Sequence, residues 1–189
     1  LHGSSDNDID LYSRWHVLRE GGGADRFARE RARSQAARLC QILSVKQERM
    51  AEDRLGVLLA FAYPERVAKR REPRGERYLL ANGTGASLPK GSLLAREQYL
   101  AVGDVDGVGS EARIFLASPI SEEDIKEVFV DGLVSVDEVH WDIREEMVVS
   151  RRVTRLGAIE LCESLLKPSG EMLRAAMVEG IRALGLDAL

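Results

Sequence analysis

The feature that most constrains this fold is a change of hydrophobic period within residues 58–86. Up to Tyr63, apolar residues recur at the three- and four-residue steps of an α-helix. From Arg77 onward, short apolar runs rich in β-forming residues alternate with turn sequences. The Asn82-Gly83 pair is the strongest short-range signal for a tight hairpin turn. The sequence therefore predicts a helical first part and a β-rich second part, joined by a basic connector.

Three helices are expected before this connector. Three glycines at 21–23 end the first helix, because they lose too much backbone entropy to remain helical. The third helix is apolar on most of its faces, so residues 58–61 should lie at the centre of a helical bundle. The expected ranges are residues 8–19, 24–43 and 51–63.

The connector begins at Pro64, which can open a new turn. Residues 65–71 are expected to form a short helix, in which Arg66, Lys69 and Arg70 share one face.

The β-rich part is predicted to contain short antiparallel strands, with one helix at 121–129 among them and one at 171–184 after them. Gly180 on the last helix would let another backbone approach closely. Five short strands with an inserted helix are typical of a small OB-like barrel. The fold class is therefore α+β: a helical segment, an OB-like antiparallel barrel with an inserted helix, and a C-terminal helix. The expected strands are residues 78–81, 99–105, 112–117, 133–141, 147–153 and 156–162, with turns at 106–109 and 142–146.

Composition bounds the class of protein. Apolar residues make up 44% and charged residues 31%, and no apolar run is long enough to cross a membrane. Cys40 and Cys162 lie far apart in apolar contexts, as in a reducing compartment. We therefore expect a cytoplasmic protein without a membrane partner. The first residue, Leu1, suggests a fragment or a processed start.

Catalytic and metal-binding patterns are missing from the sequence. Residues 83–92 lack the spacing of a phosphate-binding loop, and residues 104–107 lack the later ligands of a calcium loop. The histidines have no partner at metal-ligand spacing. We expect no catalytic residue, metal site or cofactor in this chain.

Basic residues carry the remaining signal. Residues 1–77 have 16 Lys/Arg against 12 Asp/Glu, whereas residues 78–189 have 11 against 19. Two clusters could contact a nucleic-acid backbone or only face solvent, and Tyr63, Tyr78 and Tyr99 could stack on bases or pack in the core. The clusters are Arg66, Lys69, Arg70, Arg71, Arg74 and Arg77, and Arg151, Arg152 and Arg155.

Several sequence blocks together resemble the C-terminal part of the HrpB family, bacterial ATP-dependent RNA helicases of the DEAH/RHA class. The resemblance covers roughly residues 50–185, and residues 9–49 fit the preceding helical segment less sharply. The blocks are LLAFAYPERVAKRR (58–71), YLLANGTGA (78–86), EARIFLASPI (111–120), VHWD (139–142) and RRVTRLGA (151–158).

The resemblance implies three regions: a ratchet-like helical segment (1–63), an OB-fold-like region (64–132) and a C-terminal extension of the HrpB type (133–189). In such helicases these accessory regions lie on the RecA-like motor and help to hold single-stranded RNA. The P-loop, DEAH box and arginine finger of the motor, which uses ATP and Mg, have no counterpart here. Helicase or NTP hydrolase activity is therefore assigned to no residue of this chain.

Two hypotheses follow. In the first, the chain is an accessory fragment of an ATP-dependent RNA helicase that contacts the backbone of single-stranded RNA or DNA and braces the motor domains of the same polypeptide. In the alternative, it is a protein-interaction or scaffold module without direct nucleic-acid contact.

Overall fold

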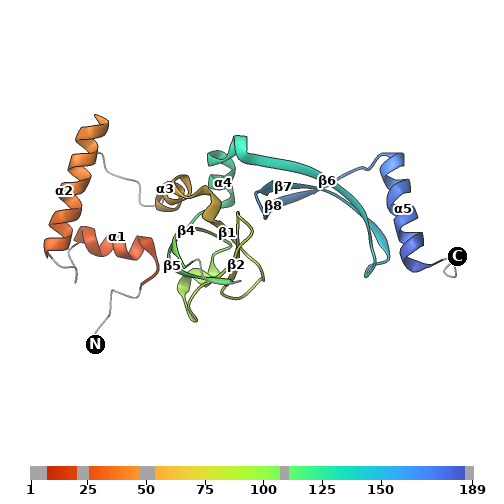
Figure 1. Ribbon diagram of the computed structural model, residues 1–189, viewed down its shortest axis with the longest axis horizontal. Helices are drawn as coiled ribbons and strands as arrows, with labels where there is room; N and C mark the ends of the chain where they lie inside the picture. The colour runs from red at the N-terminus through yellow and green to blue at the C-terminus, as the bar shows by residue number, and fades with distance from the viewer. Residues whose placement is uncertain (1–7, 21–25, 47–53, 107–110, 186–189) are drawn as a thin grey trace. The chain divides into compact units, whose positions relative to one another are not determined.

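The computed structural model describes residues 8–20, 26–46, 54–106 and 111–185. Backbone contacts divide the chain into two compact units, Leu1–Val128 and Phe129–Leu189, here called the barrel unit and the sheet unit. The described residues contain α-helices, a closed barrel and a second antiparallel sheet (Figure 1). The predicted α+β class with an OB-like barrel is confirmed. In this part of the chain no helix has the length and apolar character needed to cross a membrane.

Five short strands close the barrel in the order β1-β2-β3-β5-β4. Neighbours are antiparallel except β3 and β5, which run parallel, and β1 pairs with β4 to complete the circle. The strands are β1 (Val67–Arg70), β2 (Arg77–Leu80), β3 (Gly85–Ser87), β4 (Tyr99–Val105) and β5 (Glu111–Pro119). The expected turn at 106–109 lies mostly outside the described residues.

The prediction of a helix at 65–71 is wrong. A single 3-10 turn, η3 (Pro64–Arg66), leads directly into β1. Val67 and Ala68 are buried, and β1 hydrogen-bonds to strands on both sides, which a helix could not do. Consecutive strand residues point to opposite faces, so the connector's basic side chains do not form one helical stripe.

The Asn82-Gly83 turn forms as predicted and joins β2 to β3. The Asn82 side-chain oxygen accepts the backbone N–H of Thr84 at 2.9 Å, and Gly83 N–H donates to Leu80 O at 2.9 Å. Gly83 has a φ of 89°, in the region that favours glycine.

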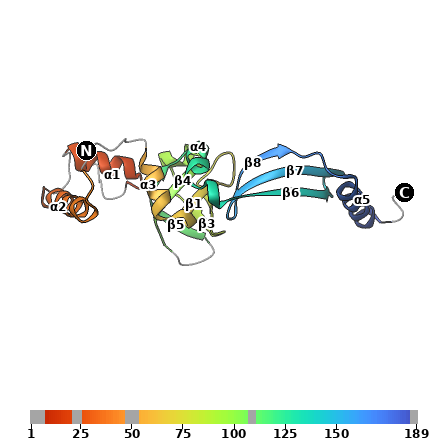
Figure 2. The ribbon, with the colours of Figure 1, turned by 90° about the horizontal axis from the view of Figure 1, so that it is seen from above.

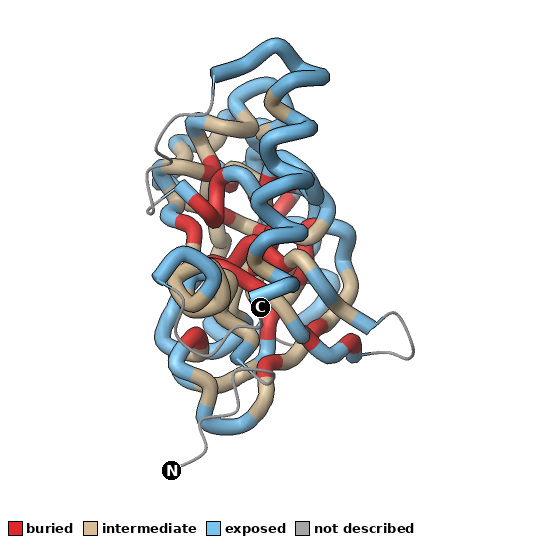
Figure 3. Tube along the Cα trace, turned by 90° about the vertical axis from the view of Figure 1, so that its left-hand side faces the viewer, coloured by how far each residue is buried: buried red, intermediate tan, exposed pale blue. Residues whose placement is uncertain are grey.

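The buried core lies inside the barrel, where Tyr78 is the largest enclosed side chain. Its hydroxyl lies 2.7 Å from Glu97 O and 3.0 Å from Leu94 O, so this buried polar group is satisfied. Desolvation by burial raises the pKa of Tyr78 to about 12. Each barrel strand supplies buried positions, and all buried residues are coloured red in Figure 3. The core residues are Ala68, Tyr78, Leu80, Ala86, Leu88, Leu94, Leu100, Val102, Ala112, Ile114 and Ala117.

Helix α3 (Leu55–Ala62) packs on the barrel instead of anchoring a helical bundle. Leu55, Val57 and Ala60 are buried against β4, β5 and α4, whereas Leu58 and Phe61 are 51% and 63% exposed. The expectation that residues 58–61 form the centre of the helical part is therefore wrong. A helix that is apolar on all sides has several faces that can be buried, and the barrel covers a different face from the one that carries Leu58 and Phe61.

The other helices of this unit were largely predicted. Helix α1 lies near β5. Just before the helix begins, Ile9 O accepts the N–H of Ala117 on β5 at 2.8 Å. Helix α2 has no buried residue, so its apolar stripe faces solvent in this chain. Ser121 caps α4, since its hydroxyl accepts the backbone N–H of Asp124 at 3.0 Å. Their bounds are α1 (Leu11–Glu20), α2 (Arg26–Leu43) and α4 (Glu122–Val128). The 3-10 turn η4 (Leu93–Arg96) has no counterpart among the predicted helices.

The sheet unit is an antiparallel meander with a helix packed on it (Figure 2). The predicted turn at 142–146 joins its first two strands: Asp142 Oδ1 accepts the backbone N–H groups of Arg144 and Glu145. The third strand begins three residues later than predicted, because Gly157, with a φ of 56°, belongs to the preceding turn. The elements are η5 (Val130–Gly132), β6 (Leu133–Asp142), β7 (Met147–Leu156), β8 (Ile159–Leu165) and α5 (Gly170–Leu184).

Gly180 of α5 does permit a close approach, but the approaching group is an indole ring and not a backbone. A Cβ atom built on Gly180 would overlap Cδ2 of Trp141 on β6. The missing side chain is therefore what allows α5 to sit on the sheet at this point.

We predict that Gly180→Ala destabilises the sheet unit by about 1–3 kcal/mol, because the added methyl overlaps the indole ring and forces the helix away. Gly170→Ala is the matched control, since a Cβ on that residue of the same helix has nothing within 4 Å. Urea unfolding of both variants, followed by circular dichroism, measures the difference. Equal stabilities of the two variants would contradict the contact.

Candidate nucleic-acid interface

The β1–β2 loop, residues 71–76, carries the two least constrained basic side chains of the predicted clusters. Arg71 and Arg74 are exposed, and no hydrogen bond or ion pair of either guanidinium is found among the described residues. The ends of the loop are joined by Arg71 N–H, which donates to Arg77 O at 2.9 Å. Gly75 has a φ of 141°, a conformation that favours glycine. Both guanidinium groups are therefore available to an external anion.

Arg66 and Arg70, from the same predicted cluster, are instead bonded within the barrel unit. Arg66 donates to Gly103 O at 3.0 Å and lies over the ring of Tyr63 at 4.6 Å. Arg70 donates to Ala95 O at 2.7 Å, which ties β1 to the η4 turn. These contacts hold the barrel together, so their donors are partly used.

Lys69 points to the outer side of β1, with its Nζ 6.0 Å from the ring centroid of Tyr99. Two of the three tyrosines that could stack on bases, Tyr78 and Tyr99, are buried. Tyr63 is 38% exposed, with the Arg66 guanidinium over its ring at 4.6 Å from the centroid. For Tyr78 and Tyr99 the structure therefore favours core packing.

The barrel's pairing brings together two arginines that are distant in the sequence. Arg77 pairs with Ser87 across β2 and β3, and Ser87 pairs with Arg113 across β3 and β5. Paired residues point to the same face, so the three side chains form a row on the outside of the barrel. Glu111 partly neutralises the row, because its Oε1 lies 2.9 Å from Arg77 Nε.

Sequence reasoning missed Arg113. The alternation of β5 indicates that its side chain faces outward, but the parallel pairing of β3 with β5 has no local signal.

The second predicted cluster is bound up in ion pairs on the sheet unit. Arg152 bonds both oxygens of Asp137, at 2.6 and 2.9 Å. The hydrogen bond from Arg152 lowers the pKa of Asp137, and the same bond raises the pKa of Arg152. On the other face, Arg151 and Arg155 share Glu138 and also contact carboxylates of β8. These pairs are Arg151 with Glu163 at 2.7 Å, Arg155 with Glu160 at 2.7 Å, and both arginines with Glu138.

These ion pairs compete with any phosphate for the same guanidinium groups. Four carboxylates face three arginines, so the cluster as a whole is not positively charged.

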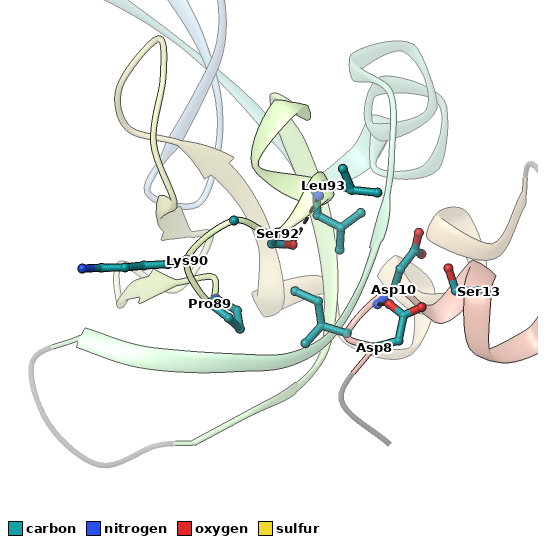
Figure 4. Close-up of a pocket in the computed structure, with 10 residues that line it drawn as sticks. Asp8, Asp10, Ser13, Pro89, Lys90, Ser92 and Leu93 are labelled. Atoms are coloured by element: carbon teal, nitrogen blue, oxygen red, sulfur yellow. Dashed lines mark hydrogen bonds between the residues drawn. The ribbon is translucent and has the colours of Figure 1, made fainter. Parts of the chain in front are cut away.

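A cavity of about 290 Å³ in the barrel unit has the wrong charge for phosphate. It lies between the start of α1 and the loop before η4, and Figure 4 shows Asp8 and Asp10 at one side of it. Lys90 points away from these carboxylates (Figure 4). Burial raises the pKa of Asp10, although its side chain still caps Tyr12 N–H at 2.9 Å. Among the described residues, no group of three His, Cys, Asp or Glu side chains could hold a metal ion.

The strand order of the barrel is that of an OB-like domain. In OB-folds the β1–β2 loop and the β2–β3 face commonly bind oligonucleotides. The particular relative is HrpB. The chain is 33% identical over 154 residues to the ATP-dependent RNA helicase HrpB of Escherichia coli. The aligned residues cover 80% of this chain and 19% of that protein. No protein-family model matches the chain.

Two solved structures agree with this relationship. The crystal structure of the E. coli DExH-box NTPase HrpB superposes with a TM-score of 0.70 at 27% identity, covering 98% of this chain and 22% of that one. A second, of the E. coli DEAH/RHA helicase HrpB, gives a TM-score of 0.69 at 23% identity, covering 100% and 22%. The chain is homologous to the C-terminal region of HrpB, as the sequence blocks indicated, and it spans about a fifth of that relative's length.

We predict that the Asp137 carboxyl titrates below the ordinary value of 3.8, because the Arg152 hydrogen bond favours its charged form. A depressed folded-state pKa adds stability that is present above the unfolded value and is lost as the pH falls through the folded one. Carboxyl NMR titration measures it, and Arg152→Ala should raise the pKa of Asp137.

Asp142 is the internal control for this titration. Backbone N–H groups lower its pKa, so Arg152→Ala should leave it unchanged. An Asp137 pKa that does not respond to Arg152→Ala would show that the ion pair is absent in solution.

Proposed function

We propose that this chain is an accessory region of an ATP-dependent RNA helicase that binds the backbone of single-stranded RNA or DNA. The observation that carries the proposal is the β1–β2 loop of an OB-like barrel, which presents Arg71 and Arg74 without carboxylate partners among the described residues. In OB-folds this loop and the adjacent β2–β3 face bind oligonucleotides.

Electrostatics supports a path along one side of the barrel. Arg77 and Arg113 extend the basic surface of the loop along the outer row of β2, β3 and β5. Guanidinium groups bind phosphate through several donors in a fixed plane, and each contact releases counterions from the nucleic acid. We assign the ion-paired Arg151, Arg152 and Arg155 a smaller share of binding, because phosphate must displace a carboxylate there.

ATP hydrolysis and unwinding would belong to the motor of the same polypeptide, with ATP and Mg as its ligands. The relative carries the name of an ATP-dependent RNA helicase, and this chain spans only a fifth of it. Bracing that motor is the second part of the proposal. The uncovered apolar stripe of α2 and the exposed Leu58 and Phe61 of α3 are suited to such packing. A cytoplasmic location also belongs to the proposal and is consistent with two free cysteines.

We predict that Arg71→Ala combined with Arg74→Ala weakens binding of a fluorescein-labelled oligouridylate by about tenfold at low salt. The slope of log affinity against log salt should fall by about 1.4, because each lost phosphate contact on a single strand accounts for about 0.7. Fluorescence anisotropy at several salt concentrations measures both quantities.

Arg152→Gln provides the control, since it removes one positive charge from a guanidinium already bonded to Asp137. Its affinity and salt slope should stay within twofold of the unaltered chain. Unchanged affinity in the double variant, or an equal loss of affinity in Arg152→Gln, would contradict the assignment of nucleic-acid binding to the β1–β2 loop.

A further inference from the structure

The outer edge of strand β6 in the sheet unit has no strand partner among the described residues, and residues 134–137 along it are exposed. Among the described residues the strand pairs with β7 alone, over ten consecutive positions from Leu133↔Leu156 to Asp142↔Met147. The register of this pairing has no shift, so no bulge twists the edge away.

The direction of the backbone groups follows from one hydrogen bond. Ser150 O accepts the N–H of Leu166, so the backbone groups of Ser150 face β8. Those of its neighbours Val149 and Arg151 therefore face β6, and so their partners on β6, His140 and Glu138, face back toward β7. The alternate residues of β6 then direct N–H and C=O outward. These residues are Leu133, Ser135, Asp137, Val139 and Trp141.

This edge lacks several of the devices by which monomeric sheets avoid strand addition. Lysine, proline and bulges are among those devices, and β6 has neither Lys, Arg nor Pro in its ten residues, so its charged side chains are all acidic. Its sequence is instead rich in β-branched and aromatic residues. Val134 and Val136 on one face are 57% and 36% exposed beside the unpaired backbone. A row of unpaired donors and acceptors flanked by apolar side chains is suited to β-augmentation.

Charge selects the chemistry of the occupant. Residues 129–189 carry 7 Lys/Arg against 11 Asp/Glu, and β6 itself has three acidic residues. The three arginines of β7 are already paired with carboxylates across the sheet. A polyanion is therefore repelled here, whereas a basic extended segment is attracted.

We propose that the outer edge of β6 is a docking site for an extended basic peptide segment of a partner protein, which adds as a fourth strand to the sheet. Its backbone pairs with the outward groups of Ser135, Asp137 and Val139. Apolar side chains at alternate positions cover Val134 and Val136, and the basic ones between them lie on the face of Asp137. This site is independent of the nucleic-acid surface proposed for the barrel unit.

The test uses a fluorescein-labelled peptide of eight residues in which lysine and valine alternate, titrated with the 189-residue chain. We expect saturable binding by anisotropy. Ser135→Pro removes an outward N–H without touching a bond to β7, and should weaken binding by about tenfold. Ser135→Ala keeps the N–H and should bind within about twofold of the unaltered chain.

Circular dichroism shows whether Ser135→Pro folds. If it does not, a second pair of variants tests whether the peptide binds at the edge of β6. Val134→Lys places a like charge beside the incoming strand and should weaken the lysine–valine peptide by about tenfold. Val178→Lys adds the same charge at an exposed valine of α5 and should have no effect.

Three results would overturn the proposal. A glutamate–valine peptide bound as tightly as the lysine–valine one would exclude charge selection. Unchanged binding in a folded Ser135→Pro or Val134→Lys variant would exclude the edge. A concentration-dependent dimer in sedimentation that Val134→Lys dissociates would identify a second copy of this chain as the occupant.

Discussion

The barrel depends on two long-range strand pairings. Strand β1 must bond to β2 on one side and β4 on the other, and β3 must run parallel to β5. These pairings close the sheet, satisfy its edges and enclose the hydroxyl of Tyr78 with two carbonyl acceptors. They also decide which charges lie together, since β3 alone brings Arg77 beside Arg113. The surface proposed to meet nucleic acid is thus a by-product of barrel closure.

Arginines in this chain serve two different purposes. Those of β7 cross-link strands through carboxylates and supply the polar faces of a three-stranded sheet with a small apolar core. Those of the β1–β2 loop have no such partners among the described residues. A count of basic residues cannot separate the two groups, because the distinction rests on which acidic side chain the fold brings opposite each one. The two units therefore differ in the kind of ligand that their charges favour.

Local signals in the sequence were sufficient for much of the fold. Strand β4 has its predicted bounds, and the turns at Asn82-Gly83 and 142–146 form, because residue types next to one another determine them. The sequence predicts a helix where β1 lies, since only pairing with β2 and β4 makes residues 67–70 extended. Arg71 and Arg74 could be proposed from the sequence because they belong to one local basic cluster. Arg113 could not, because only the pairing of β3 with β5 places it near them.

The contact between Gly180 and Trp141 has one more consequence. The chain has two tryptophans, and they fall in different units: Trp15 on α1 of the barrel unit and Trp141 under α5 of the sheet unit. An indole packed against a helix backbone changes its emission when that helix leaves. In a chain with Trp15→Phe the tryptophan emission would therefore come from the sheet unit alone, and each unit can be followed by its own tryptophan without an added label.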